Sequence, residues 1–151
     1  MLAILSPAKS LDYDTPLPPL ATTRPRFAGD HLPDGMISCS VALADKLDVL
    51  AGLFGIGQVP TGERDPFGLR RASLGVIRIL VERELELSLF DLVNEAFKGY
   101  AGKIGDAHSD LETFIFDRAR GYFQERGYSA SEVESVLCLR PTRLDLVTKQ
   151  L

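Results

Sequence analysis

Between residues 37 and 141 the apolar residues recur at the spacing of amphipathic helices. From Ile37 the repeat predicts one helix that ends at Gly52 or Gly55. Four further apolar stripes follow it along the chain. The residues expected to face inward are Leu69, Ala72, Ser73, Val76, Ile77 and Leu80; Leu89, Leu92, Val93, Ala96, Phe97 and Tyr100; Leu111, Phe114, Ile115, Ala119 and Tyr122; and Val133, Val136 and Leu137.

Each of the four stripes begins and ends with residues typical of helix termini. The expected starts are Asp65 with Pro66, and three Ser-x-x-Asp/Glu pairs that resemble capping boxes, at Ser88 and Asp91, Ser109 and Glu112, and Ser129 and Glu132. The expected stops after the last three are Gly102, Gly127 and Pro141. Because patterning, caps and stops agree, the sequence predicts an all-α helical bundle.

The remaining segments are not predicted to be helical. Residues 1–5 are apolar and predict a short strand, and the prolines at 16, 18, 19 and 25 favour an extended or disordered head over residues 1–24. Residues 54–62 are rich in glycine, but their spacing matches neither common phosphate-binding loop. We therefore expect a hinge between two helical units there.

Composition narrows the function classes. Hydrophobic residues make up 45% of the chain and charged residues 25%, which is typical of a globular protein. The net charge of −4 argues against a strongly basic, sequence-independent nucleic-acid binder, so any RNA contact requires a local arginine patch. No signal peptide or membrane-length apolar run is found, and we expect a soluble, cytoplasmic protein without a membrane partner.

Few residues offer catalytic or metal-binding chemistry. Cys39 and Cys138 lack metal-ligand spacing and are expected to be two buried, reduced thiols. The two histidines, His31 and His108, are expected in solvated loops. No Ser/His/Asp or Cys/His set, and no acid–base pair of carboxylates, points to an active site.

Two charged patterns leave alternatives open. Asp45 and Asp48 lie three residues apart and suit either a metal or, with Lys46, a solvated helix face, which we favour. Arg71 and Arg78 share a face, with Arg70 beside them, and Arg78 can pair with Glu82 at i,i+4. An arginine row suits phosphate binding or an ordinary salt-bridged surface equally well.

Long segments of the body resemble the β subunit of bacterial glycyl-tRNA synthetase. The resemblance rests on residues 42–58, on residues 60–80 and on the shorter strings at 25–30 and 139–143. It implies part of an aminoacyl-tRNA synthetase, a glycine–tRNA ligase of protein biosynthesis, with tRNA(Gly) and the synthetase α subunit as partners. It also implies that activation of glycine, with ATP and Mg²⁺, belongs to the α subunit, so that this chain needs no cofactor and has no catalytic residue.

The resemblance also implies a division of the chain. Residues 25–62 would be the end of an HD-like region, in which Asp45 is a remnant metal position without its upstream partners, so no metal is expected. Residues 63–151 would be a partial anticodon-binding domain of the DALR type, in which Gly68 replaces a more usual alanine inside the first helical turn. The candidate tRNA-binding residues are Arg70, Arg71, Arg78, Arg140 and Arg143.

The head resembles a different family. Residues 4–13 are similar to the opening of the YaaA family of peroxide-stress proteins, in which Lys9 would be a candidate functional residue. Two alternatives to tRNA recognition therefore stay open: a stress-response DNA-binding protein, and an inert helical remnant of a chimeric gene.

Overall fold

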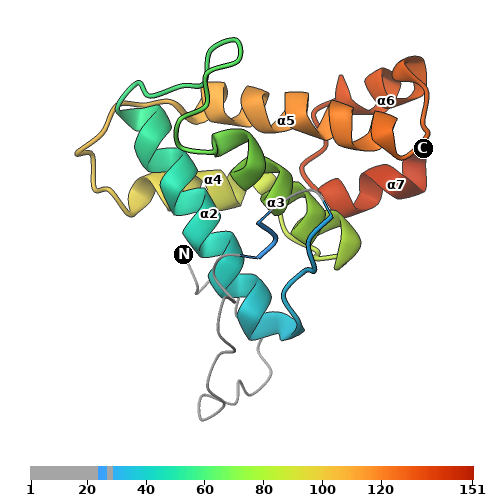
Figure 1. The fold of residues 1–151 in the computed structure, drawn as a ribbon, viewed down its shortest axis with the longest axis horizontal. Coiled ribbons are helices and arrows are strands. Elements are labelled where there is room, and N and C mark those ends of the chain that lie inside the picture. The colour runs from blue at the N-terminus through green and yellow to red at the C-terminus, as the bar shows by residue number, and fades with distance from the viewer. Residues whose placement is uncertain (1–23, 27–28) are drawn as a thin grey trace.

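The computed structural model describes residues 24–26 and 29–151 of the chain (Figure 1). The predicted all-α architecture is confirmed, and the only β-type pairing in the described part is a single bridge between Thr61 and Arg64. The predictions for the head, including the strand at 1–5 and Lys9, lie outside the described residues. The elements are α2 (Gly35–Gly55), α3 (Leu69–Glu82), α4 (Leu89–Lys98), α5 (His108–Glu125), α6 (Ala130–Leu137), the 3-10 helix η1 (Leu144–Leu146) and α7 (Val147–Gln150).

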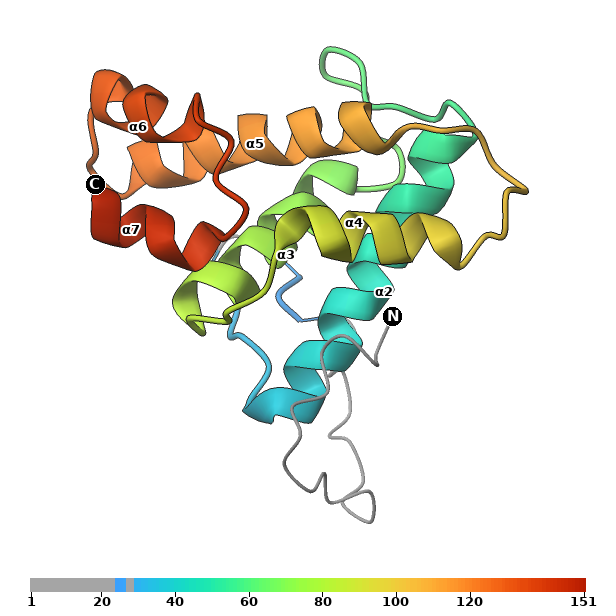
Figure 2. The same cartoon turned by 180° about the vertical axis from the view of Figure 1, so that it is seen from behind.

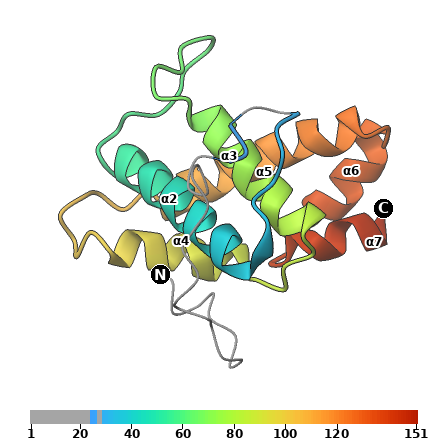
Figure 3. The same cartoon turned by 60° about the horizontal axis from the view of Figure 1, so that its bottom comes forward.

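Helix α3 is the centre of the assembly. It packs against α2 on one side and against α5 on the other, and Figure 3 shows it between the two. Helix α4 lies against both α2 and α5, and α6, η1 and α7 gather at the far end of α5 (Figure 2). Helix α3 therefore contacts elements from both halves of the described chain.

The predicted apolar stripes form the core. All of the predicted inward residues are buried except Ala72, Tyr100 and Phe114, which are half-buried against the same core. Helix α2 differs from the others because it is apolar on most of its circumference, with Met36 and Val49 exposed. Buried residues of α2 and of α3 to α7 belong to one hydrophobic cluster, across the predicted boundary at residues 62–63.

The predicted helix starts are only partly right. Ser129 forms the predicted capping box with Glu132, and the Ser88 hydroxyl accepts a hydrogen bond from the Asp91 amide at 3.3 Å. The start at Ser109 is wrong, because α5 begins at His108 and its cap residue, Ala107, offers no side-chain oxygen.

The start of α3 differs most from the prediction. The helix begins at Leu69 rather than at Pro66, and Gly68 lies outside it with a left-handed φ of 66°. The placement of Gly68 inside the first helical turn is therefore wrong: glycine suits this position because it tolerates positive φ. Asp65 does cap the helix, since its carboxylate accepts from the amides of Leu69 (2.8 Å) and Arg70 (3.0 Å).

The helices end slightly before their predicted stops. Helix α4 ends at Lys98 rather than at Gly102, and α6 ends at Leu137, ahead of Pro141. Helix α5 ends at Glu125, and Gly127 follows with a φ of 100°. Gly102 and Gly127 therefore lie in the turns after their helices, and Pro141 lies beyond the turn that follows α6.

The connection from α4 to α5 is hydrogen-bonded to the C-terminal part of α2. The hydroxyl of Tyr100 donates to the carbonyl of Asp48 at 2.7 Å, and the amide of Gly105 donates to the carbonyl of Gly55 at 2.9 Å. There is no room for a side chain at position 52 of α2, since a Cβ on Gly52 would lie 2.4 Å from Tyr100 Oη. Helix α2 is thereby fixed to the rest of the bundle.

The prediction that Asp45, Lys46 and Asp48 form a solvated helix face is wrong for Lys46. Asp45 and Asp48 are exposed, but Lys46 is only 7% exposed because its stem runs between α2 and α3. Gly75 makes the space, since a Cβ there would lie 2.7 Å from Cε of Lys46. Burial lowers the pKa of Lys46, as expected for an ammonium group removed from water.

Candidate nucleic-acid interface

The five candidate arginines differ in how accessible they are. Arg70, Arg71 and Arg78 lie on α3, whereas Arg140 and Arg143 lie in the connection between α6 and η1. An arginine that binds phosphate needs free donors at the surface. The partners of each guanidinium therefore decide which candidates can serve.

Arg78 is buried and forms an ion pair within the protein. The residue is 9% exposed, and its Nε donates to Oε1 of Glu82 at 3.0 Å while its Nη2 donates to Oε2 at 3.4 Å. The predicted i,i+4 pair is confirmed. Arg78 and Arg71 do not share a solvent-facing row, because Arg78 is buried and pairs with Glu82 whereas Arg71 is exposed.

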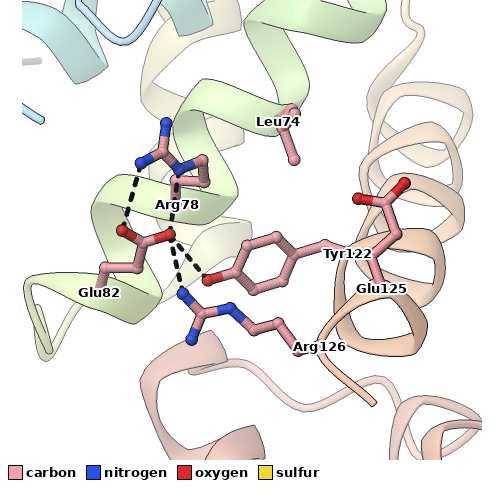
Figure 4. A pocket seen from close by; sticks show the side chains of 6 residues that line it. All are labelled: Leu74, Arg78, Glu82, Tyr122, Glu125 and Arg126. Carbon is pink, nitrogen blue, oxygen red and sulfur yellow. Dashed lines mark hydrogen bonds and ion pairs between the residues drawn. The ribbon is translucent and has the colours of Figure 1, made fainter. Parts of the chain in front are cut away.

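Glu82 is the centre of a network between α3 and α5 (Figure 4). Its Oε1 also accepts from the hydroxyl of Tyr122 at 3.0 Å and from Nη2 of Arg126 at 3.1 Å. The Arg126 guanidinium lies over the Tyr122 ring, 4.8 Å from its centroid, which is a cation–π distance. These side chains therefore tie the C-terminal end of α3 to the C-terminal end of α5.

The surrounding pocket has a balanced charge. It has a volume of about 300 Å³ and is lined by two arginines and two glutamates together with Leu74 and Tyr122. Both arginine side chains already contact Glu82. The side chains of this pocket therefore serve to hold α3 and α5 together rather than to bind an anion. We call these side chains, Arg78, Glu82, Tyr122 and Arg126, the α3–α5 joint.

The pKa shifts of Glu82 and Tyr122 agree with a structural role for these side chains. Burial alone would raise the pKa of Glu82, but the hydrogen bonds from Arg78 and Tyr122 outweigh burial and hold that pKa below its usual value. Burial raises the pKa of Tyr122, and the charge of Glu82 raises it further. Glu82 is therefore the ionised acceptor and Tyr122 the neutral donor over the physiological range.

Arg143 is also committed to a structural contact. Its Nε and Nη2 donate to the two carboxylate oxygens of Asp145 at 3.1 and 2.6 Å, and Nη2 lies 3.3 Å from Glu86. Asp145 is buried, so the bidentate pair compensates its charge. The hydrogen bond to Asp145 raises the pKa of Arg143. The Arg143–Asp145 pair thereby anchors the start of η1.

Arg140 stands apart from the arginines of α3. It is exposed, with a left-handed φ of 46°, and its Nη2 donates to the hydroxyl of Thr113 on α5 at 3.1 Å. It borders a second pocket, between α5 and α6, that also contains Arg120. Arg120 pairs with Asp117 and Glu134, so acidic groups accompany this pocket as well.

Arg70 and Arg71 lie where the connection from α2 enters α3. In Figures 1 and 2 this connection, residues 56–68, projects beyond the helices as a hairpin-like loop. The Arg70 guanidinium donates to the carbonyl of Gly62 and holds the loop against the helix. Arg71 is exposed, as is Arg64 in the turn of the loop. Among the five candidates, Arg71 and Arg140 are exposed, and Arg71 has the exposed Arg64 near it in the chain.

Sequence reasoning missed three residues that bear on the site. Arg126 was not singled out, because its partner Tyr122 was assigned only to the core stripe. Arg64 and Phe67 lie in the loop and belong to no periodic pattern, although Phe67 is 53% exposed. An aromatic residue beside the proline of a predicted helix start, outside the apolar stripe of that helix, was the available signal.

The remaining chemistry-bearing side chains form no further site. Cys39 is buried and donates to the carbonyl of Pro33 at 3.4 Å, but Cys138 is exposed, so the prediction of two buried thiols is wrong for Cys138. His31 is exposed, whereas His108 opens α5 and stacks on Phe97 at 4.1 Å rather than lying in a loop.

Two searches of the described residues, 24–26 and 29–151, gave negative results. They contain no cluster of three or more His, Cys, Asp or Glu side chains placed to hold a metal ion. Within the same ranges, no helix combines the length and the apolar character needed to cross a membrane.

Comparison with known proteins gives one consistent result. The family model described as glycyl-tRNA synthetase beta subunit matches residues 21–138. The glycine–tRNA ligase beta subunit of Paracidovorax citrulli is 58% identical over 128 residues, which are 85% of this chain and 18% of that protein. The subunit of Thiobacillus denitrificans is 54% identical over 85% of this chain and 18% of its own length, and that of Edwardsiella ictaluri 51% over 79% and 18%. The chain thus spans about a fifth of the length of these curated relatives.

Proposed function

We propose that this chain, which belongs to the family of glycyl-tRNA synthetase beta subunits, is a tRNA-recognition part of a glycine–tRNA ligase. In this role it supports the synthesis of glycyl-tRNA for translation. The proposal treats the helical bundle as a scaffold for RNA contact rather than as a reaction site.

The observation that carries the proposal is the exposed, arginine-bearing end of α3. Arg64 and Arg71 are exposed there, and Arg70 is held beside them by its bond to Gly62. Phosphate contacts provide most of the affinity of RNA-binding proteins and come mainly from such guanidinium groups. Arg78 and Arg143 then serve to build the scaffold, and Arg140 is a separate, secondary candidate.

We assign the chemical step to a partner. Activation of glycine, with ATP and Mg²⁺, belongs on this proposal to a separate α subunit, with which the longer beta subunit assembles. The anticodon-binding assignment of residues 63–151 and the HD-like assignment of residues 25–62 are part of the same proposal. The expected location is the cytoplasm, where translation takes place.

A charge-reversal pair tests the proposed surface. Arg71→Glu should weaken binding of glycine-specific tRNA by about 10- to 150-fold, because a charge-assisted hydrogen bond is worth about 1.5–3 kcal/mol. It should also flatten the dependence of log K on log salt concentration by about one phosphate contact. Arg83→Glu is the matched control: Arg83 is exposed at the opposite end of α3 and pairs with the exposed Asp34.

The two variants have the same net charge, so their comparison separates site from overall electrostatics. Equal losses in both variants would show diffuse attraction and contradict a site at the start of α3. Unchanged affinity in both would remove Arg71 from the RNA surface. Circular dichroism of each variant checks that the helices are intact.

A further inference from the structure

Phe67 is the one phenylalanine or tyrosine that is exposed among the residues the structure describes. Its exposed fraction is 53%, whereas Phe54, Phe97, Phe116, Phe123 and Tyr122 are buried and the other described rings are half-buried. An aromatic ring in water loses the burial that stabilises a core. Its position on a projecting loop therefore suggests contact with a ligand.

The loop holds Phe67 in a defined place. Thr61 and Arg64 exchange two backbone hydrogen bonds, of 3.2 and 2.9 Å, which close the hairpin turn. Asp65 accepts from the first two amides of α3, and the amide of Gly68 donates to the carbonyl of Asp65 at 3.2 Å. Phe67 lies inside this second turn and is thus presented on an ordered segment, which lowers the entropy cost of binding.

The charges around Phe67 favour an anionic partner. Arg64 precedes it by three residues and Arg71 follows it by four, and both are exposed. The carboxylate of Asp65, between them, is occupied by the amides of α3. The exposed Glu63 is the one other charged side chain of this stretch that is not bound to α3. An exposed ring with two exposed arginines near it in the chain is a combination with which proteins bind unpaired nucleotides: bases stack on the ring and arginines hold the phosphates.

We propose that Phe67 stacks on an unpaired base of the bound tRNA, with Arg64 and Arg71 on the neighbouring phosphates. This assignment rests on the proposed function and specifies the element of the RNA that the loop reads. Duplex RNA does not offer its base faces, so the contact requires a loop or another single-stranded segment.

Three substitutions of Phe67 in the full 151-residue chain test the stacking. The probes are glycine-specific tRNA, its isolated anticodon stem–loop and a fully paired RNA duplex. Phe67→Ala should weaken binding of the tRNA about 5- to 100-fold, the range of one lost base–aromatic stack. Phe67→Leu keeps an apolar side chain without a π-face and should weaken binding similarly, whereas Phe67→Trp should retain it.

The controls separate stacking from other effects. Affinity for the paired duplex should be unchanged in all three variants, because only phosphates contribute there. Leu139→Ala removes an apolar side chain that is 78% exposed in another loop and should leave tRNA binding unchanged. Since Phe67 is not part of the core, the melting temperature should not fall in any variant.

Each contrary outcome has a distinct meaning. If the wild-type chain binds tRNA and all Phe67 variants bind equally well, the stacking assignment is wrong and the proposed function stands. If Phe67→Leu binds like the wild type, the contact is apolar and not a stack. If the variants lose self-association or protein contacts instead, Phe67, Ile56 and Val59 form a protein interface. If the wild-type chain binds none of the RNAs, both proposals fail for this chain.

Discussion

The contact between Gly52 and Tyr100 allows a sharp test of how α2 is joined to the bundle. A Cβ at position 52 would lie 2.4 Å from Tyr100 Oη and 2.9 Å from Cζ. Real Cβ atoms do not approach so closely, so Gly52→Ala must displace the ring. The displacement breaks the hydrogen bond from Tyr100 to the carbonyl of Asp48.

Two opposing terms set the size of the effect. Alanine in a helix interior is favoured over glycine by about 1 kcal/mol. Against this, the lost hydrogen bond costs about 1 kcal/mol and overpacking about 1–3 kcal/mol. We expect Gly52→Ala to destabilise the wild type by about 1–3 kcal/mol, the two losses less the gain from alanine. In a Tyr100→Ala background the clash is absent, and the same substitution should stabilise the protein by about 1 kcal/mol.

Urea unfolding of the four proteins in this double-mutant cycle measures the coupling. Gly121→Ala is the control, because Gly121 lies in α5 and a Cβ there would meet no atom within 4 Å. It should stabilise both backgrounds alike, by up to about 1 kcal/mol. A stabilising effect of Gly52→Ala in the wild type would refute the reasoning and show that the connection does not hold α2.

Three further predictions follow from single sites. Glu82→Gln should destabilise the protein by about 2 kcal/mol in urea unfolding, because it removes the half-buried carboxylate that pairs with both Arg78 and Arg126. The pKa of Glu82 is lowered from 4.5, so its contribution is present above pH 4.5 and lost as the pH falls through the folded-state value; acid unfolding should show a smaller loss in the variant. Gly68→Ala should cost about 1–2 kcal/mol in thermal unfolding, since φ is 66° there. Cys138 should react with iodoacetamide far faster than the buried Cys39, as mass spectrometry of the labelled peptides would show.

Local signals in the sequence were sufficient for the helices themselves. The stripes of α3 to α6 are set by periodicity, and the Ser129 cap by its neighbour Glu132, so both could be predicted. The start of α3 could not, because the left-handed turn at Gly68 lets Asp65 cap the helix from four residues upstream. A cap of this kind looks like an ordinary helix start until the backbone is known.

The roles of the charged residues depended on tertiary contacts. Nothing near Lys46 in the sequence shows that Gly75 opens a space for it, and nothing near Arg78 shows that Tyr122 and Arg126 close over its partner. Helical spacing could place Arg71 and Arg78 on a common face of α3, but it could not show that Arg78 is buried and Arg71 exposed. The arginine candidates were therefore found by sequence and sorted by structure.

The central claim, that this chain recognises tRNA, is tested most directly by titrating the purified chain with glycine-specific tRNA and with a non-cognate tRNA at two salt concentrations. The account predicts binding that favours the glycine-specific tRNA and weakens as salt rises, because phosphate contacts release counterions. A chain that is folded and helical by circular dichroism, yet binds neither tRNA at the lower salt concentration, would contradict it.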